Sequence, residues 1–160
     1  MPVAGWPPYK RVYGFRTDKA ILEKLRVLVP GKKILALELS QEAYYHGDTV
    51  LCAMGQKLEY LMVYPQGLTP ASLNKLKSDF TGKLMYLSQR DAALFAANSF
   101  YVDAGEDQFL FCPPGLSQEL LHAVQGLSIK PVPIDVSEFF QKGGGSVKCM
   151  LCDLGPGAEH

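Results

Sequence analysis

Short apolar runs alternate with amphipathic stretches along this chain, and the alternation recurs at a fixed interval. With residue numbers shifted by 48, the segment 59–69 aligns without a gap with the segment 107–117. Each copy predicts a short apolar strand, a turn containing Pro and Gly, and a Thr or Ser residue that caps a helix. The helix carries apolar residues three to four positions apart, and a further apolar strand follows it.

A strand-like run also stands ahead of each copy, at 46–54 and at 94–102. The repeating unit is therefore strand, strand, helix, strand. Repeats at this period are typical of propeller-like or solenoid arrangements, in which neighbouring units cover each other's apolar faces.

An incomplete copy comes first, with a strand over 11–15, a helix over 18–29 capped by Thr17, and a strand over 33–39. After the third copy, Gly143–Gly145 leads to a lone strand over 147–154.

These patterns predict one domain of mixed α/β (α+β) class over residues 1–160, built as part of an α/β-propeller. Its units lie at roughly 9–39, 44–88 and 92–135, with the terminal strand 147–154 left over, so about three units are present. We expect the leftover strand to pair beside 11–15, within the chain or across a dimer, because two unpaired edges favour aggregation.

Charge and composition narrow the class of partner. Sixteen basic and sixteen acidic residues balance, and 48% of residues are hydrophobic, which excludes a disordered chain and a partner held mainly by charge, such as a nucleic acid. Residues 1–40 nevertheless carry a net +5 and residues 91–139 a net −6, which favours ring closure or self-association. No apolar run reaches ~18 residues and the first residues do not resemble a signal peptide, so we expect a cytoplasmic protein without a membrane partner.

The four cysteines are expected to be reduced. Cys52 and Cys112 lie inside apolar strands and are best explained as core residues. Cys149 and Cys152 could form half a zinc site or a redox pair. Both interpretations are weak, because no second ligand pair is spaced closely and the surrounding residues have β character.

His46 and Asp48 are the first candidates for chemistry. If 46–54 is a strand, alternation places both side chains on one face. The aligned residues of the sister unit are Leu94 and Ala96, so the scaffold does not itself require His or Asp at these positions. The alternative is a solvated strand edge, but the pairing of the two favours a site.

Cys149 is the second candidate. It follows three glycines and Ser146, and a glycine-rich segment lets the backbone approach a ligand closely and adopt positive φ. The alternative is an inert core cysteine.

These segments resemble those of the pentein superfamily of guanidino-modifying enzymes, which includes arginine deiminase, dimethylarginine dimethylaminohydrolase and amidinotransferases. The run His46-Gly-Asp48-Thr49 is similar to its His-x-Asp segment, and 136–149 is similar to its catalytic-cysteine loop. The segment 15–18, containing Arg16, and the segment 95–98, which ends at Asn98, are similar to two further family stretches. The resemblance runs from about 13 to 154 and concerns the C-terminal part of the family's fold.

The resemblance implies covalent cysteine catalysis on a small arginine-like guanidine, by hydrolysis of a C–N bond or by amidino transfer, with no cofactor and no metal. Cys149 would be the nucleophile, His46 the proton donor and water activator, and Asp48 the ligand of the guanidinium group. Arg16 would hold the substrate carboxylate, or else is a solvated arginine at a helix start. Asn98 receives no role.

The chain also departs from the family's pattern. A ring of five units and a glycine-rich acidic segment are typical of the family, and neither is found in these 160 residues. The alternatives are therefore a catalytically silent partial pentein that acts as a binding or assembly module, a homo-oligomer that completes the ring, or a fragment of a longer enzyme.

Overall fold

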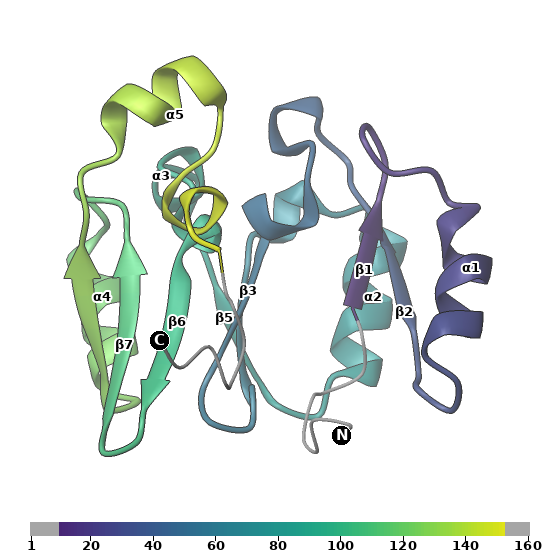
Figure 1. Cartoon of the computed structure of the whole chain (residues 1–160), viewed down its shortest axis with the longest axis horizontal. Helices are drawn as coiled ribbons and strands as arrows, with labels where there is room; N and C mark the ends of the chain where they lie inside the picture. Colours follow the sequence, from purple (N-terminus) through teal and green to yellow (C-terminus); the bar gives the residue numbers. More distant parts are fainter. Residues whose placement is uncertain (1–9, 153–160) are drawn as a thin grey trace, which may run out of the picture.

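The computed structural model describes residues 10–152 (Figure 1). In this range the strands are β1 (Lys10–Tyr13), β2 (Leu35–Glu38), β3 (Leu51–Met54), β4 (Tyr60–Val63), β5 (Lys83–Tyr86), β6 (Phe100–Ala104), β7 (Asp107–Cys112) and β8 (Ile129–Pro133). The α-helices are α1 (Ile21–Leu28), α2 (Pro70–Asp79), α3 (Gln89–Ala93), α4 (Gln118–Gln125) and α5 (Ser137–Gly143). The 3₁₀ helices are η1 (Glu42–Tyr44), η2 (Gly47–Thr49), η3 (Pro65–Gly67), η4 (Ala96–Asn98) and η5 (Val147–Met150).

The strands form three small sheets that stand side by side (Figure 1). Two of them have the same design: an outer strand runs antiparallel to the middle strand, and the strand after the helix runs parallel to it. These are β3-β4-β5 and β6-β7-β8. The first sheet holds β1 and β2 in parallel, which are the second and third strands of the same unit. The expected mixed α/β class is confirmed.

The helix caps predicted for the two complete copies are present. Thr69 accepts a hydrogen bond from the backbone N–H of Ser72, and Ser117 accepts one from that of Leu120. The predicted cap at Thr17 is wrong, because α1 begins only at Ile21 and its N-cap residue is Ala20. The Asp18 carboxylate accepts a bond from the N–H of Ala20, and this short polar turn takes up the first predicted helical residues.

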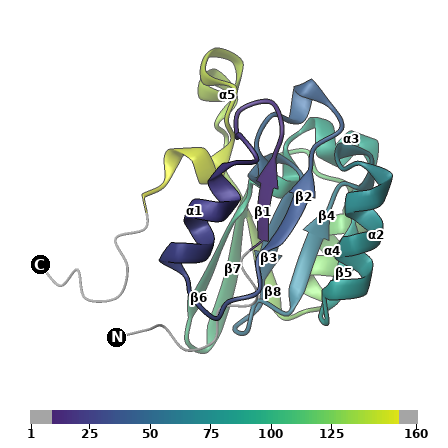
Figure 2. The ribbon, with the colours of Figure 1, turned by 90° about the vertical axis from the view of Figure 1, so that its right-hand side faces the viewer.

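The core is continuous across the sheets. Helix α2 packs on β2 of the neighbouring sheet and so helps to cover it. Figure 2 shows α2 and α4 along the same side of the sheets. Fully buried side chains at the centre include Leu37, Met62, Leu76 and Leu110. At roughly 1.5–3 kcal/mol for each large buried side chain, this core holds the turns at the ends of the strands in place.

The sequence predicted strands at 46–54, 94–102 and 147–154, and each of these predictions is wrong for the first part of the segment. Each segment begins with a 3₁₀ turn, and β3 and β6 start only after η2 and η4. In the first two turns a side-chain hydroxyl closes the backbone on itself: Thr49 donates to the carbonyl of His46 at 2.6 Å, and Ser99 to that of Ala96 at 2.7 Å. Such local bonds compete with extended structure.

The terminal strand is likewise not formed where the structure describes it. Residues 147–150 make η5, while 153 and 154 lie outside the described range. Between residues 10 and 152, β1 pairs with β2 and not with the terminal segment, so the expected pairing beside 11–15 is not observed there.

Candidate functional site

Three of the 3₁₀ turns, η2, η4 and η5, meet at one end of the sheets. Turn η4 contacts both η2 and η5. Each turn carries one polar residue of interest: Asp48 in η2, Asn98 in η4 and Cys149 in η5. These turns therefore bring together side chains that lie far apart in the sequence.

Cys149 and Asp48 face each other across this junction. The Cys149 thiol donates to Oδ2 of Asp48 at 3.9 Å, and the cysteine is exposed while the aspartate is half-buried. The other carboxylate oxygen of Asp48, Oδ1, is buried and has no hydrogen-bond partner among residues 10–152. A buried carboxylate oxygen without a donor is costly, so the Asp48 carboxylate gains from any added N–H donor that can reach it.

The sequence pattern predicted that His46 and Asp48 lie on one face of a strand, and this is wrong, because Asp48 lies in a 3₁₀ turn. His46 is extended and exposed, and it immediately precedes η2. Its ring packs edge-on against Tyr45, with 4.8 Å between the ring centroids. His46 thus belongs to the same loop as Asp48, two residues away, and the 3₁₀ turn determines how the two side chains are oriented relative to each other.

Tyr45 connects three of the segments and was not identified from the sequence. Its hydroxyl donates to the carbonyl of Gly144 at 2.8 Å, and the Arg16 guanidinium lies over its ring, 5.4 Å from the centroid. A guanidinium over an aromatic face is attracted to it. Arg16 is exposed, and its contact with Tyr45 places it beside the loop that carries His46. The only sequence signal for Tyr45 was its position next to His46.

Two of the three glycines before Cys149 lie where a side chain would clash with the protein's own atoms, and Gly144 has the positive φ that the sequence led us to expect. Gly144 has a φ of 72°, and a Cβ there would lie 2.7 Å from the Tyr45 hydroxyl oxygen. A Cβ on Gly145 would lie 2.6 Å from that of Cys149. Larger residues at either position would displace the turn that carries the thiol.

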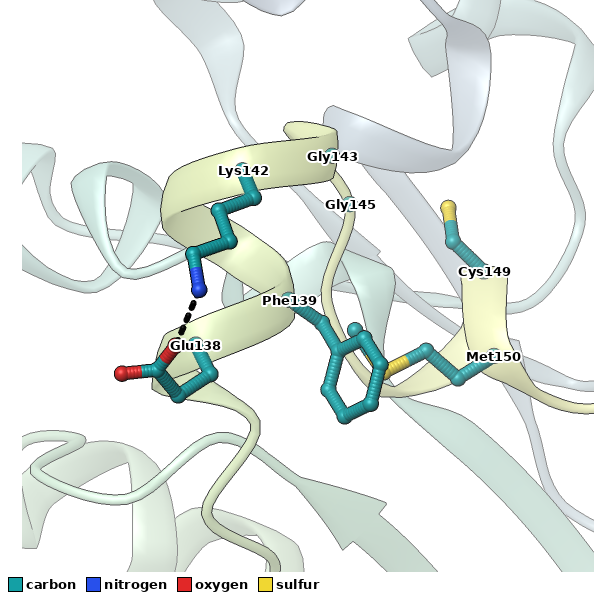
Figure 3. A pocket seen from close by; sticks show the side chains of 7 residues that line it. All are labelled: Glu138, Phe139, Lys142, Gly143, Gly145, Cys149 and Met150. Carbon is teal, nitrogen blue, oxygen red and sulfur yellow. Dashed lines mark hydrogen bonds and ion pairs between the residues drawn. The ribbon is translucent and has the colours of Figure 1, made fainter.

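A cavity of about 560 Å³ adjoins Cys149 on the side of α5. Its lining residues are Glu138, Phe139, Lys142, Gly143, Gly145, Cys149 and Met150. Figure 3 shows the Phe139 ring beside the Met150 side chain, and Lys142 in an ion pair with Glu138. The sulfur atom of Cys149 points away from Phe139 and Met150. The nucleophile candidate therefore stands between this cavity and Asp48.

The four thiols fall into two classes. Cys52 and Cys112 are buried, as expected, and burial raises the pKa of each thiol to about 11. Cys149 and Cys152 are exposed. Within the described part of the chain, no three His, Cys, Asp or Glu residues are grouped so as to hold a metal ion.

We expect iodoacetamide at pH 8 to label Cys149 and Cys152 and to leave Cys52 and Cys112 unlabelled in the folded protein. With a pKa of about 11, only about one in a thousand of the buried thiols is a thiolate at that pH. Peptide mass spectrometry after a short exposure measures this, and unfolding in urea is the control that should release all four. Rapid labelling of Cys52 in the native protein would contradict the packing described above.

Comparison with known proteins identifies the class to which this fold and junction belong. A family model described as N,N-dimethylarginine dimethylhydrolase, eukaryotic, matches residues 12–155. The chain belongs to this family, and hence to the pentein superfamily of guanidino-modifying proteins.

Individual relatives agree. The chain is 29% identical over 144 residues to N(G),N(G)-dimethylarginine dimethylaminohydrolase of Mycobacterium tuberculosis, covering 90% of this chain and 44% of that protein. It is 26% identical over 119 residues to the bifunctional arginine dihydrolase/ornithine cyclodeaminase AgrE of a Nostoc species, covering 74% and 16%. The crystal structure of apo ArgZ, a cyanobacterial arginine dihydrolase, superposes with a TM-score of 0.76 at 25% identity, covering 91% and 23%.

The chain thus spans less than half the length of these curated relatives. None of the helices described here is long and apolar enough to cross a bilayer.

Proposed function

We propose that this protein acts on an arginine-like guanidine by covalent cysteine catalysis that hydrolyses a C–N bond. The observation that carries the proposal is the Asp48 carboxylate beside the exposed thiol of Cys149, with one oxygen, Oδ1, that has no hydrogen-bond partner among residues 10–152. A guanidinium group supplies planar N–H donors to a carboxylate and an electrophilic carbon to a thiolate.

The proposed reaction uses two side chains directly. The Cys149 thiolate attacks the guanidinium carbon and forms a C–S bond, and the C–N bond to the departing amine breaks as His46 donates a proton to that nitrogen. His46 then takes a proton from water, whose oxygen attacks the thiouronium carbon and releases Cys149. The balance is guanidine plus water giving a ureido product and an amine.

Asp48 supplies the charge that the reaction needs. A thiolate at Cys149 and a carboxylate at Asp48, 3.9 Å apart, would repel each other. A guanidinium cation bound between them is attracted to both, so substrate binding would offset this repulsion. Rotation about the Cβ–Cγ bond of Asp48 exchanges its two oxygens, which lets either one accept the substrate N–H.

Arg16 is proposed to hold a substrate carboxylate. It is exposed, and its stacking on Tyr45 aims a cation at the loop that carries His46. A planar guanidinium binds a carboxylate through two parallel hydrogen bonds, which suits an amino-acid substrate.

The family and the relatives support hydrolysis rather than transfer. The M. tuberculosis relative is named as a dimethylarginine dimethylaminohydrolase and the Nostoc relative as an arginine dihydrolase. Both names describe proteins that act on arginine or a methylated arginine. We extend to this chain the shared chemistry, which is hydrolysis at a guanidino carbon.

We also propose that residues 1–160 form one partial propeller domain. The identical order of the β3-β4-β5 and β6-β7-β8 sheets supports this, together with the matching position of β1 and β2 in a third unit.

One observation favours a second function, binding or assembly without turnover. In the described part of the chain the first sheet has two strands, whereas each of the others has three. An outer strand from another polypeptide, or from a second copy, would complete it by main-chain pairing.

Protection of Cys149 from alkylation tests the proposed function. Excess L-arginine or dimethylarginine should slow iodoacetamide labelling of Cys149 while labelling of Cys152, three residues away, continues unchanged. In Asp48→Asn, which keeps the side-chain shape and removes the charge, the protection should be lost. Equal labelling of both cysteines with and without each guanidine would refute the proposal.

A further inference from the structure

Asn98 occupies the centre of the junction described above. Its side chain is fully buried at the end of η4, between η2 and η5. Its Oδ1 accepts a hydrogen bond from the backbone N–H of Ser146 at 2.9 Å, and its Nδ2 donates a long bond, 3.5 Å, to the backbone carbonyl of Asp48. One amide therefore bridges the segments that carry the nucleophile and the carboxylate.

The structure supplies a counterpart for this residue in the preceding sheet. Thr49 bonds to the carbonyl three residues before it as Ser99 does, so Asn98, which stands just before Ser99, corresponds to Asp48. Two turns of the same design thus carry different polar side chains into the junction, and the amide of Asn98 bonds to two partners there. An asparagine suits them because one side of its amide accepts and the other donates.

The turn that carries Asn98 is itself rigidly held. Phe95, which opens it, has a left-handed φ of 55°, a conformation that costs a non-glycine residue of order 1 kcal/mol or more. The Asn98 N–H closes the turn on the Phe95 carbonyl at 2.8 Å, and Ala96 and Ala97 are fully buried. The buried, hydrogen-bonded turn therefore holds the backbone of Asn98 in place.

The cysteine segment, in contrast, follows a run of three glycines. Its first fully buried residue is Ser146, and the N–H of Cys149 then bonds to the Ser146 carbonyl at 3.1 Å. Movement at Ser146 is transmitted directly to the thiol.

We infer that Asn98 is a positioning residue, which sets the separation of Cys149 from Asp48 by bonding to both of their segments. Its effect on guanidine binding rests on the proposed function, whereas its effect on the Ser146 amide does not.

Two substitutions separate the contributions of the two hydrogen bonds that Asn98 makes, to the Ser146 N–H and to the Asp48 carbonyl. Asn98→Leu removes both bonds at similar volume. Asn98→Asp keeps an acceptor for the Ser146 N–H and removes the donor to the Asp48 carbonyl. Ser99→Ala is the matched control, because Ser99 is buried in the same turn but its hydroxyl bonds only locally, to Ala96.

Two measurements on the full chain decide the question. Amide hydrogen exchange by ¹⁵N NMR should show the Ser146 N–H exchanging about tenfold faster or more in Asn98→Leu, as expected for a lost buried hydrogen bond, and near the native rate in Asn98→Asp and Ser99→Ala. Protection of Cys149 by dimethylarginine should fall about tenfold or more in both Asn98 variants and persist in Ser99→Ala.

Unchanged Ser146 exchange in Asn98→Leu, or an equal increase in Ser99→Ala, would overturn the inference. If Asn98→Leu does not fold, Asn98→Asp decides: full guanidine protection there would also overturn it. If the native protein shows no guanidine protection at all, the proposed function fails, while the exchange rates still decide the structural role of Asn98.

Discussion

Cys149→Ser is expected to abolish turnover of the guanidine substrate, whereas Cys152→Ser should retain it. A serine hydroxyl at this position is a much weaker nucleophile than a thiolate, because a hydroxyl ionises far less readily than a thiol. Loss of a nucleophile in such a site lowers kcat by about 10³-fold or more, which corresponds to ~4 kcal/mol of barrier.

Colorimetric detection of the ureido product, together with the released amine, measures this loss. Cys152 is the matched control, since it is exposed, of the same type and three residues away. Calorimetric titration should show that Cys149→Ser still binds the guanidine, because Asp48 is intact. Undiminished turnover in Cys149→Ser would remove Cys149 from the mechanism, and binding without turnover in the native chain would favour the binding or assembly role.

Asp91→Ala is expected to give the largest loss of stability. Asp91 is 2% exposed, and its carboxylate accepts from the Ser88 hydroxyl at 2.6 Å and from the Ser117 N–H and hydroxyl at 2.7 and 2.8 Å. It therefore ties the start of α3 to the start of α4. Removing it takes the acceptor from the half-buried Ser117 and from the exposed Ser88, at about 1–3 kcal/mol of the free energy of unfolding.

The pH dependence of this effect has a definite sign. Burial acts to raise the pKa of Asp91, but the hydrogen bonds from Ser88 and Ser117 outweigh it and hold the pKa below its ordinary value. A carboxyl whose pKa is lowered by folding stabilises the protein above its unfolded pKa of about 3.9 and loses that contribution as the pH falls through the folded value.

Urea unfolding of the native protein and the variant should therefore differ by the full amount at pH 7 and by less as the pH falls through the lowered folded pKa of Asp91. Asp135→Ala is the control: hydrogen bonds from Ser137 also lower the pKa of Asp135, but this residue is exposed and should contribute little. A difference for Asp91→Ala that is constant down to low pH would contradict the ionic account.

The two complete copies show which local features could be predicted. The caps at Thr69 and Ser117 formed as expected, because a hydroxyl before a helix bonds to an N–H only three residues away. The 3₁₀ turns were missed for a related reason. Thr49 and Ser99 also bond locally, but within runs whose apolar composition favours a strand.

The family could be predicted from the amino-acid order, and the repeat and the four candidate residues could be proposed from it, because periodic apolar positions, turn residues and short motifs extend over a few residues. The contact of Cys149 with Asp48, the bridge through Asn98 and the place of Tyr45 between Arg16 and Gly144 were decided only in three dimensions. Each joins residues between 29 and 101 positions apart. Their approach depends on how the small sheets pack side by side, which is set by the shared core and not by any one segment.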